Sequence, residues 1–126
     1  MVDHFQDLKY VLQTLGLPVI GQVRLVEEDC SRIDVLSGAF ASAHRAVQVE
    51  AGEALTAEQI ALLAQLDQRL ARVQQQTQAP LCSELAMRQS ADWRQVRNMA
   101  REALVRFHWT LELPPEEVLE SRRYLN

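Results

Sequence analysis

Apolar residues recur at intervals of three and four along four separate stretches of this chain, and this spacing constrains its fold more than any other feature. The first stretch, for example, places Phe5, Leu8, Leu12 and Leu15 along one side of a helix. Spacing of this kind is typical of a helix that buries one face and exposes the other. The pattern predicts four long helices, near residues 4–15, 29–50, 57–77 and 91–109.

Residues that cap or interrupt helices separate these stretches. The interruptions are Gly16, Pro18, Gly52, Pro80 and the pair Pro114–Pro115. Thr56 followed by Gln59 fits a capping box, in which each residue satisfies a free backbone N–H of the other at a helix start. Ser90 or Asp92 can cap the fourth long helix in a similar way. These signals support the helix boundaries that the apolar spacing predicts.

Long amphipathic helices joined by short polar connections predict an all-α helical bundle. Four main helices form it, and shorter helical pieces are expected at residues 81–89 and 115–125. With 126 residues, 48% of them hydrophobic, the chain favours one domain over residues 1–126. A chain of this size buries enough surface to need neither a metal ion nor a disulfide.

Three short segments allow a competing α+β fold. Residues 23–26, 47–50 and 110–114 each alternate between apolar and polar side chains. Alternation is the period of a half-buried strand, so these segments could pair into a small three-stranded sheet. The longer helical pattern favours the all-α bundle, and paired strands at these positions would overturn it.

The sequence carries no motif that predicts catalysis. The three histidines lie far apart, and none belongs to an HExxH metal motif. No GxSxG elbow is present, and four glycines are too few for a phosphate-binding loop. Cys30 and Cys82 follow no metal spacing; we expect Cys30 to be buried and Cys82 to react faster with thiol reagents. No cofactor or metal ion is therefore expected, and a non-catalytic role is favoured over an enzyme.

Charge and hydropathy predict a soluble cytoplasmic protein. The first ten residues lack the basic region of a signal peptide. The longest uncharged segment, residues 10–23, is interrupted by Gly16, Pro18 and Gly21 and is too short to span a bilayer. A net charge of −4 argues against general binding of polyanions.

The fourth predicted helix has apolar residues on both sides. Its core stripe contains Trp93, Val96, Ala100, Ala103, Leu104, Phe107 and Leu111. The opposite side carries Arg94, Asn98, Arg101, Val105 and Trp109, with Arg97 at its margin. Three explanations are open: the helix ends before Trp109 and the ring turns inward, the helix is covered on both faces by its own chain, or Val105 and Trp109 are exposed anchors surrounded by arginines. Tryptophan and arginine often dominate the energy of protein interfaces.

We therefore predict a small protein–protein interaction module: an adaptor, regulator or assembly factor. Its partner-binding residues are Arg94, Arg97, Asn98, Arg101, Val105 and Trp109. The partner is another protein or a second copy of the chain, and a homodimer is the simplest assembly. The alternative is a nucleic-acid-associated regulator that places the arginine ridge in a major groove. The core stripe on the other side of the helix argues against that alternative, and neighbouring Asp92 and Glu102 are acids that could neutralise the ridge.

Overall fold

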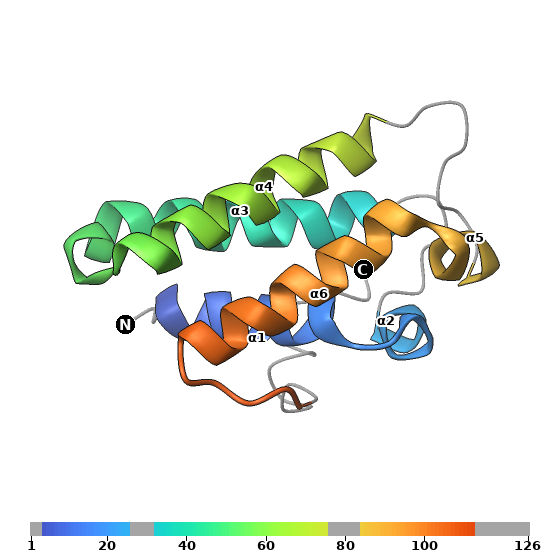
Figure 1. The fold of residues 1–126 in the computed structure, drawn as a ribbon, viewed down its shortest axis with the longest axis horizontal. Helices are drawn as coiled ribbons and strands as arrows, with labels where there is room; N and C mark the ends of the chain where they lie inside the picture. The colour runs from blue at the N-terminus through green and yellow to red at the C-terminus, as the bar shows by residue number, and fades with distance from the viewer. Residues whose placement is uncertain (1–3, 26–31, 76–83, 113–126) are drawn as a thin grey trace.

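A computed structural model describes residues 4–25, 32–75 and 84–112 of the chain (Figure 1). The long helices are α1 (His4–Gly16), α3 (Arg32–Ala51), α4 (Ala57–Gln74) and α6 (Ala91–Arg106). Shorter elements are α2 (Val19–Leu25), α5 (Glu84–Gln89) and the 3-10 turn Gly52–Ala54. The predicted all-α bundle is confirmed. The three-stranded alternative is wrong where it can be followed, because residues 23–25 and 47–50 are helical and the described residues contain no strand.

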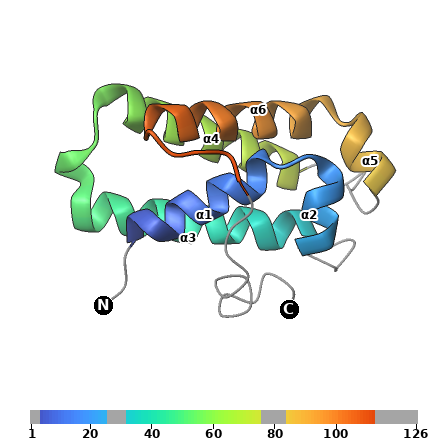
Figure 2. The same cartoon turned by 90° about the horizontal axis from the view of Figure 1, so that it is seen from below.

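The four long helices form an up-and-down bundle. Helix α1 packs against α3 and α6, and α4 packs against the same two helices. Helices α1 and α4 run in one direction, and α3 and α6 run in the other (Figures 1 and 2). The short helices α2 and α5 contact each other at the end of the bundle where α1 stops and α6 begins (Figure 2).

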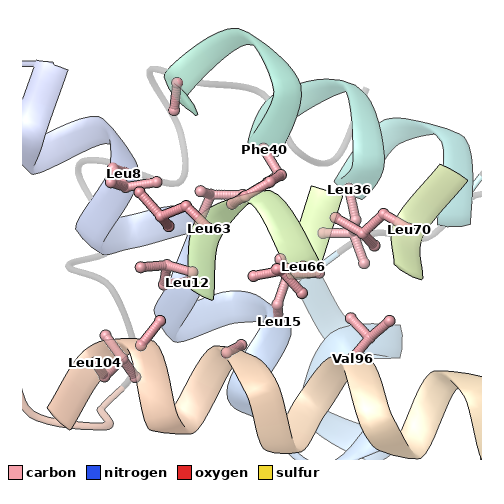
Figure 3. Close-up of a cluster of buried hydrophobic side chains, with 14 of the residues drawn as sticks. Leu8, Leu12, Leu15, Leu36, Phe40, Leu63, Leu66, Leu70, Val96 and Leu104 are labelled. Carbon is pink, nitrogen blue, oxygen red and sulfur yellow. The ribbon is translucent and has the colours of Figure 1, made fainter. Parts of the chain in front are cut away.

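The core lies between the long helices, and every one of them contributes to it (Figure 3). Fully buried side chains include Leu8, Leu12, Leu15, Leu36, Phe40, Leu63, Leu66, Leu70, Val96 and Leu104. Burial of one such side chain contributes about 1.5–3 kcal/mol, so the predicted apolar stripes supply most of the stability of the bundle. Ile60 has the same spacing as the apolar residues of α4 that are buried, but it lies in the first turn of that helix and is 45% exposed.

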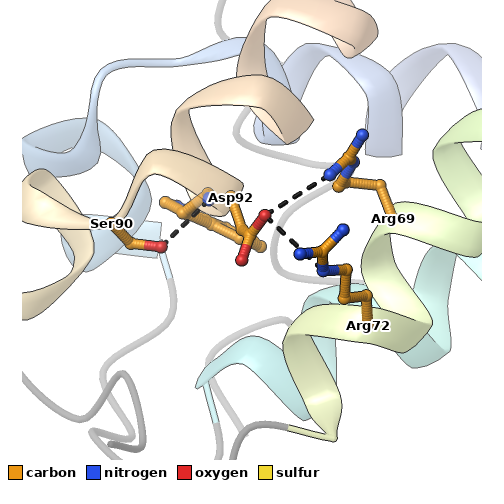
Figure 4. Close-up of polar contacts among 5 residues, drawn as sticks. Arg69, Arg72, Ser90 and Asp92 are labelled. Carbon is orange, nitrogen blue, oxygen red and sulfur yellow. Dashed lines mark hydrogen bonds and ion pairs between the residues drawn. The ribbon is translucent and has the colours of Figure 1, made fainter.

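Two helix starts have the predicted caps. At α4, the Thr56 hydroxyl accepts a hydrogen bond from the Gln59 N–H (3.1 Å), and the Gln59 side-chain oxygen accepts one from the Thr56 N–H (2.9 Å). This reciprocal pair confirms the capping box. At α6, the Ser90 hydroxyl accepts a bond from the Trp93 N–H at 3.1 Å (Figure 4). Ser90, not Asp92, is therefore the cap of α6.

Helix α2 was not predicted, because Gly16 and Pro18 were interpreted only as a stop signal. The chain instead starts a new helix directly after Pro18. Proline has no N–H to leave unpaired and its φ suits the first turn of a helix. The Pro18 carbonyl accepts bonds from the N–H groups of Gly21 (2.9 Å) and Gln22 (3.2 Å), which closes the first turn of α2.

A buried glutamine joins α2 to both of its long neighbours. Gln22 is fully buried, and its side-chain amide donates to the carbonyls of Leu15 (2.8 Å) and Thr14 (3.3 Å) at the end of α1. Its side-chain oxygen accepts a hydrogen bond from the indole N–H of Trp93 on α6 at 2.9 Å. Because buried polar groups are costly when unpaired, this network fixes the position of α2 against the bundle.

Several predictions concern residues 1–3, 26–31, 76–83 and 113–126, which lie outside the described residues. Among them are the reactivities of Cys30 and Cys82 and the short helix at residues 115–125. The predicted helical piece at 81–89 is confirmed in its described part by α5.

Candidate functional site

The end of α6 decides where the predicted partner-binding residues lie. The helix ends at Arg106, not at residue 109 as predicted. His108 has a positive φ of 59°, its N–H donates to the Val105 carbonyl (3.0 Å), and the Trp109 N–H donates to the Leu104 carbonyl (2.8 Å). These two bonds around a left-handed residue form a Schellman motif, which turns the chain away from the helix axis.

The Schellman motif directs Trp109 onto the core. The indole ring stacks on Phe107, with ring centroids 4.6 Å apart and planes 9° from parallel. Both rings are partly buried and pack against the core cluster. The structure thus agrees with the first of the three explanations: the helix ends before Trp109, and its ring turns inward.

The arginines of α6 meet α2 and α5 at a surface hollow. Arg94 is exposed, whereas Arg97 and Arg101 are half-buried. Together with Arg88 of α5 and residues 18–20 at the start of α2, they line a hollow of about 370 Å³. Residues three or four apart are neighbours on a helix, so Arg94, Arg97 and Arg101 present adjacent guanidinium groups along one face of α6.

Arg101 is held in place by the end of α1. Its Nε donates a 2.7 Å hydrogen bond to the carbonyl of Gly16, the last residue of that helix. Carbonyls at a helix C-terminus carry partial negative charge and favour a cation. Gly16 also makes room, because a Cβ atom there would lie 3.2 Å from Cγ of Arg101 and 3.0 Å from Cδ1 of Leu111. The glycine therefore serves close contact with α6 as well as helix termination.

Like charges in the hollow affect one another. Burial lowers the pKa of Arg97, and the neighbouring charges of Arg101 and Arg94 lower that pKa further. Arginine keeps its proton at neutral pH despite such a shift. Burial is the larger cause of this lowering of the pKa, and repulsion between like charges is the smaller one; a bound anion would relieve the repulsion.

The acids of α6 face away from the hollow. Asp92 lies 3.4 Å from Nη1 of Arg69 and 3.9 Å from Nε of Arg72, both on α4 (Figure 4). Glu102 pairs with Arg106 at 3.8 Å. No carboxylate within the described ranges pairs with Arg94, Arg97 or Arg101. Asp92 and Glu102, which could have neutralised the ridge, instead pair with basic residues outside it.

The remaining predicted residues lie further along α6. Asn98 is exposed, and Val105 is 67% exposed. After α6, the chain passes back along α1, where the Gln13 side chain donates to the Thr110 carbonyl at 2.8 Å, and Leu111 stays 44% exposed. The structure thus gathers the three arginines, leaves Asn98 and Val105 exposed on the same helix, and separates Trp109 from them.

Sequence analysis missed Arg88 and the α2 wall of the hollow. Arg88 lies before Ser90, which caps the start of α6, so it was not considered together with the arginines of α6. The α2 wall had no signal, since Pro18 was interpreted as a terminator. Only the packing of α2 beside α5 and α6 places these residues together.

A second hollow, of about 550 Å³, lies between the start of α1 and the end of α3. Its charged side chains include His4 and Glu50, which lie 3.8 Å apart, and Arg45. Small side chains such as Ala41 and Ala46 form much of the rest. Because opposite charges meet at this hollow, it offers a ligand no concentrated charge of one sign.

Across the described segments, no three His, Cys, Asp or Glu side chains are close enough to hold a metal ion. No helix in those segments combines the length and apolarity needed to cross a membrane. The fold and the hollow define an antiparallel four-helix bundle with an arginine-lined surface at one end. Comparisons with protein-family models, curated proteins and solved structures found no match to this chain.

Proposed function

We propose that this chain is a non-catalytic protein–protein interaction module that binds an acidic segment of its partner in the arginine-lined hollow. The observation that carries the proposal is the gathering of Arg94, Arg97 and Arg101 around one hollow without a described carboxylate partner. Guanidinium groups form paired, charge-assisted hydrogen bonds with carboxylates and similar anions. An acidic segment therefore fits the hollow in both charge and hydrogen-bonding geometry.

Apolar residues beside the hollow add to a protein interface. Ile20 lines the hollow and is 45% exposed, and Val105 lies one helical turn beyond Arg101. Exposed apolar side chains near arginines are typical of surfaces that contact other proteins. The partner is another protein or, in a homodimer, a second copy of this chain.

A protein partner is favoured over nucleic acid for two reasons. The net charge of −4 opposes the long-range attraction of a polyanion. The arginines also line a hollow beside α2, whereas a helix that reads a major groove must project from its domain. Nucleic acid remains the alternative partner, and the binding experiment must distinguish it from a protein partner.

The test measures binding of a fluorescent hexaglutamate peptide by anisotropy at low and physiological ionic strength. We expect salt-dependent binding that Arg94→Gln weakens several-fold. Arg45→Gln is the matched control, because Arg45 is another exposed helical arginine but lies on α3, far from the hollow in sequence and at a different surface. Equal losses in the two variants would show that only total charge matters, and would contradict the proposal.

The same experiment addresses the other partners. A duplex DNA that binds more tightly than the peptide at equal ionic strength would favour the nucleic-acid alternative. Sedimentation velocity of the protein alone tests self-association. A dimer that Arg94→Gln dissociates and Arg45→Gln preserves would identify the second copy as the partner.

A further inference from the structure

The hollow gathers more positive charge than one carboxylate can neutralise. Arg94, Arg97 and Arg101 occupy successive turns of α6 and line the same hollow, and these three residues together carry three positive charges. A carboxylate carries one negative charge and two oxygens. A phosphate monoester carries a charge of about −1.5 to −2 at neutral pH and three strong acceptor oxygens. The charge and donor count of this hollow therefore match a phosphate group better than a single acidic side chain.

The orientation of Arg101 supports the same ligand. Its Nε is occupied by the Gly16 carbonyl at 2.7 Å, which restrains the guanidinium plane while both η nitrogens keep their donors. A restrained donor loses less conformational entropy on binding. Planar guanidinium groups match the oxygens of phosphate in pairs, which an ammonium group cannot do.

The lining residues other than the arginines are apolar. They are Pro18, Val19 and Ile20, and the described lining contains no aromatic ring on which a nucleobase could stack. Such a lining suits the short methylene or methyl portion of a phosphorylated serine or threonine. The volume of about 370 Å³ is in keeping with a compact side chain.

We infer that the hollow between α2, α5 and α6 binds a phosphorylated serine or threonine side chain of a partner protein. This inference rests on the proposed function, because it specifies the anion on the partner's acidic segment. Recognition of phosphorylated motifs by arginine clusters is a recurring mode of peptide binding. Binding would then depend on a kinase that acts on the partner.

The test uses three degenerate seven-residue peptide libraries that differ only at the central position, which is serine, glutamate or phosphoserine. Binding to the full chain is measured by fluorescence anisotropy at physiological ionic strength. We expect the phosphoserine library to bind at least tenfold more tightly than the glutamate library, and the serine library to show no binding. Inorganic phosphate should compete only at millimolar concentration.

Two substitutions at Arg97 separate charge from geometry. Arg97→Gln should abolish the preference for phosphoserine over glutamate. Arg97→Lys should retain only part of this preference, because lysine keeps the charge but lacks the paired N–H donors of a planar guanidinium group. Arg45→Gln should leave the preference unchanged. Circular dichroism of each variant verifies that the helices are intact, so a loss of binding is assigned to the hollow.

The outcomes distinguish the two proposals. Equal affinity for phosphoserine and glutamate libraries would overturn this inference while the proposed function stands. Absence of binding to every library, and to hexaglutamate at low salt, would overturn both. Inorganic phosphate that binds as tightly as the phosphoserine library would overturn the assignment to a protein side chain and indicate a free phosphate site.

Discussion

The buried glutamine of α2 allows the sharpest test of how this bundle is held together. Gln22→Met keeps the length of the side chain and its helix propensity but removes both its donors and its acceptor. The indole N–H of Trp93 then loses the partner that it contacts at 2.9 Å, and the Leu15 carbonyl loses a 2.8 Å bond. Both Gln22 and Trp93 are 0% exposed, so water cannot replace those partners without opening the core.

The cost follows from the groups left unpaired. The Trp93 indole N–H and the Leu15 carbonyl each cost about 1–3 kcal/mol when they lose their partner, so Gln22→Met should lower the free energy of unfolding by about 2–6 kcal/mol. For a chain of 126 residues this corresponds to a fall in Tm of roughly 10–20 °C. Urea unfolding followed by far-UV circular dichroism measures the first quantity, and a thermal melt measures the second. Gln68→Met, at an exposed position of α4, is the matched control and should change stability by less than about 0.5 kcal/mol.

A double-mutant cycle isolates the pair. Trp93→Phe removes the indole N–H, so in its presence Gln22→Met leaves one fewer group unpaired. We expect the two losses to be non-additive by about 1–2 kcal/mol. Strict additivity, or a Gln22→Met variant as stable as the control, would refute the assignment of Gln22 as the link between α1, α2 and α6.

Four further substitutions test local features of the fold by the same unfolding measurements. Gly38→Ala should raise the free energy of unfolding by about 1 kcal/mol, because Gly38 is a solvent-exposed residue in the middle of α3 and no atom lies within 4 Å of a new Cβ. Gly16→Ala should lower the free energy of unfolding, because a Cβ there meets side chains at 3.0 Å. His108→Gly should raise it by about 0.5–1 kcal/mol, since φ is 59° at this position and glycine adopts that conformation without strain; no gain would show that the Schellman turn is not strained. Burial lowers the pKa of His44, and the charge of Asp67 raises it only in part. Because its pKa is lower in the folded state, His44 binds a proton more readily in the unfolded chain. The stability that the neutral His44 contributes is therefore complete above pH of about 6.5, and it is lost as the pH falls below that value toward the lowered pKa of the folded state. His44→Gln should flatten this part of the stability–pH profile, and an unchanged profile would assign it to other groups.

The sequence by itself determined the helices of the bundle and two of their caps. Apolar spacing located α1, α3, α4 and α6 because one buried stripe per helix repeats every three or four residues. Thr56 and Gln59 sit three positions apart and satisfy each other's backbone, so the start of α4 needs no distant contact. The sequence predicts such features because the interacting groups lie within one or two helical turns of each other.

Only the tertiary structure decided at which residue α6 ends and which elements pack beside this helix. The apolar spacing predicted that the helix continues through Trp109. In the structure, packing of the Trp109 ring against the core outweighs the conformational free energy that a left-handed His108 costs. Helix α2 exists because Gln22 can pair with residues 8 positions back along the chain and with Trp93, 71 positions further on. The hollow has the same origin: Arg101 reaches Gly16 across 85 positions, and residues 18–20 meet the arginines only when both helix ends are packed. Contacts between groups so distant in sequence leave no periodic pattern, so this part of the molecule becomes visible only once the bundle has formed.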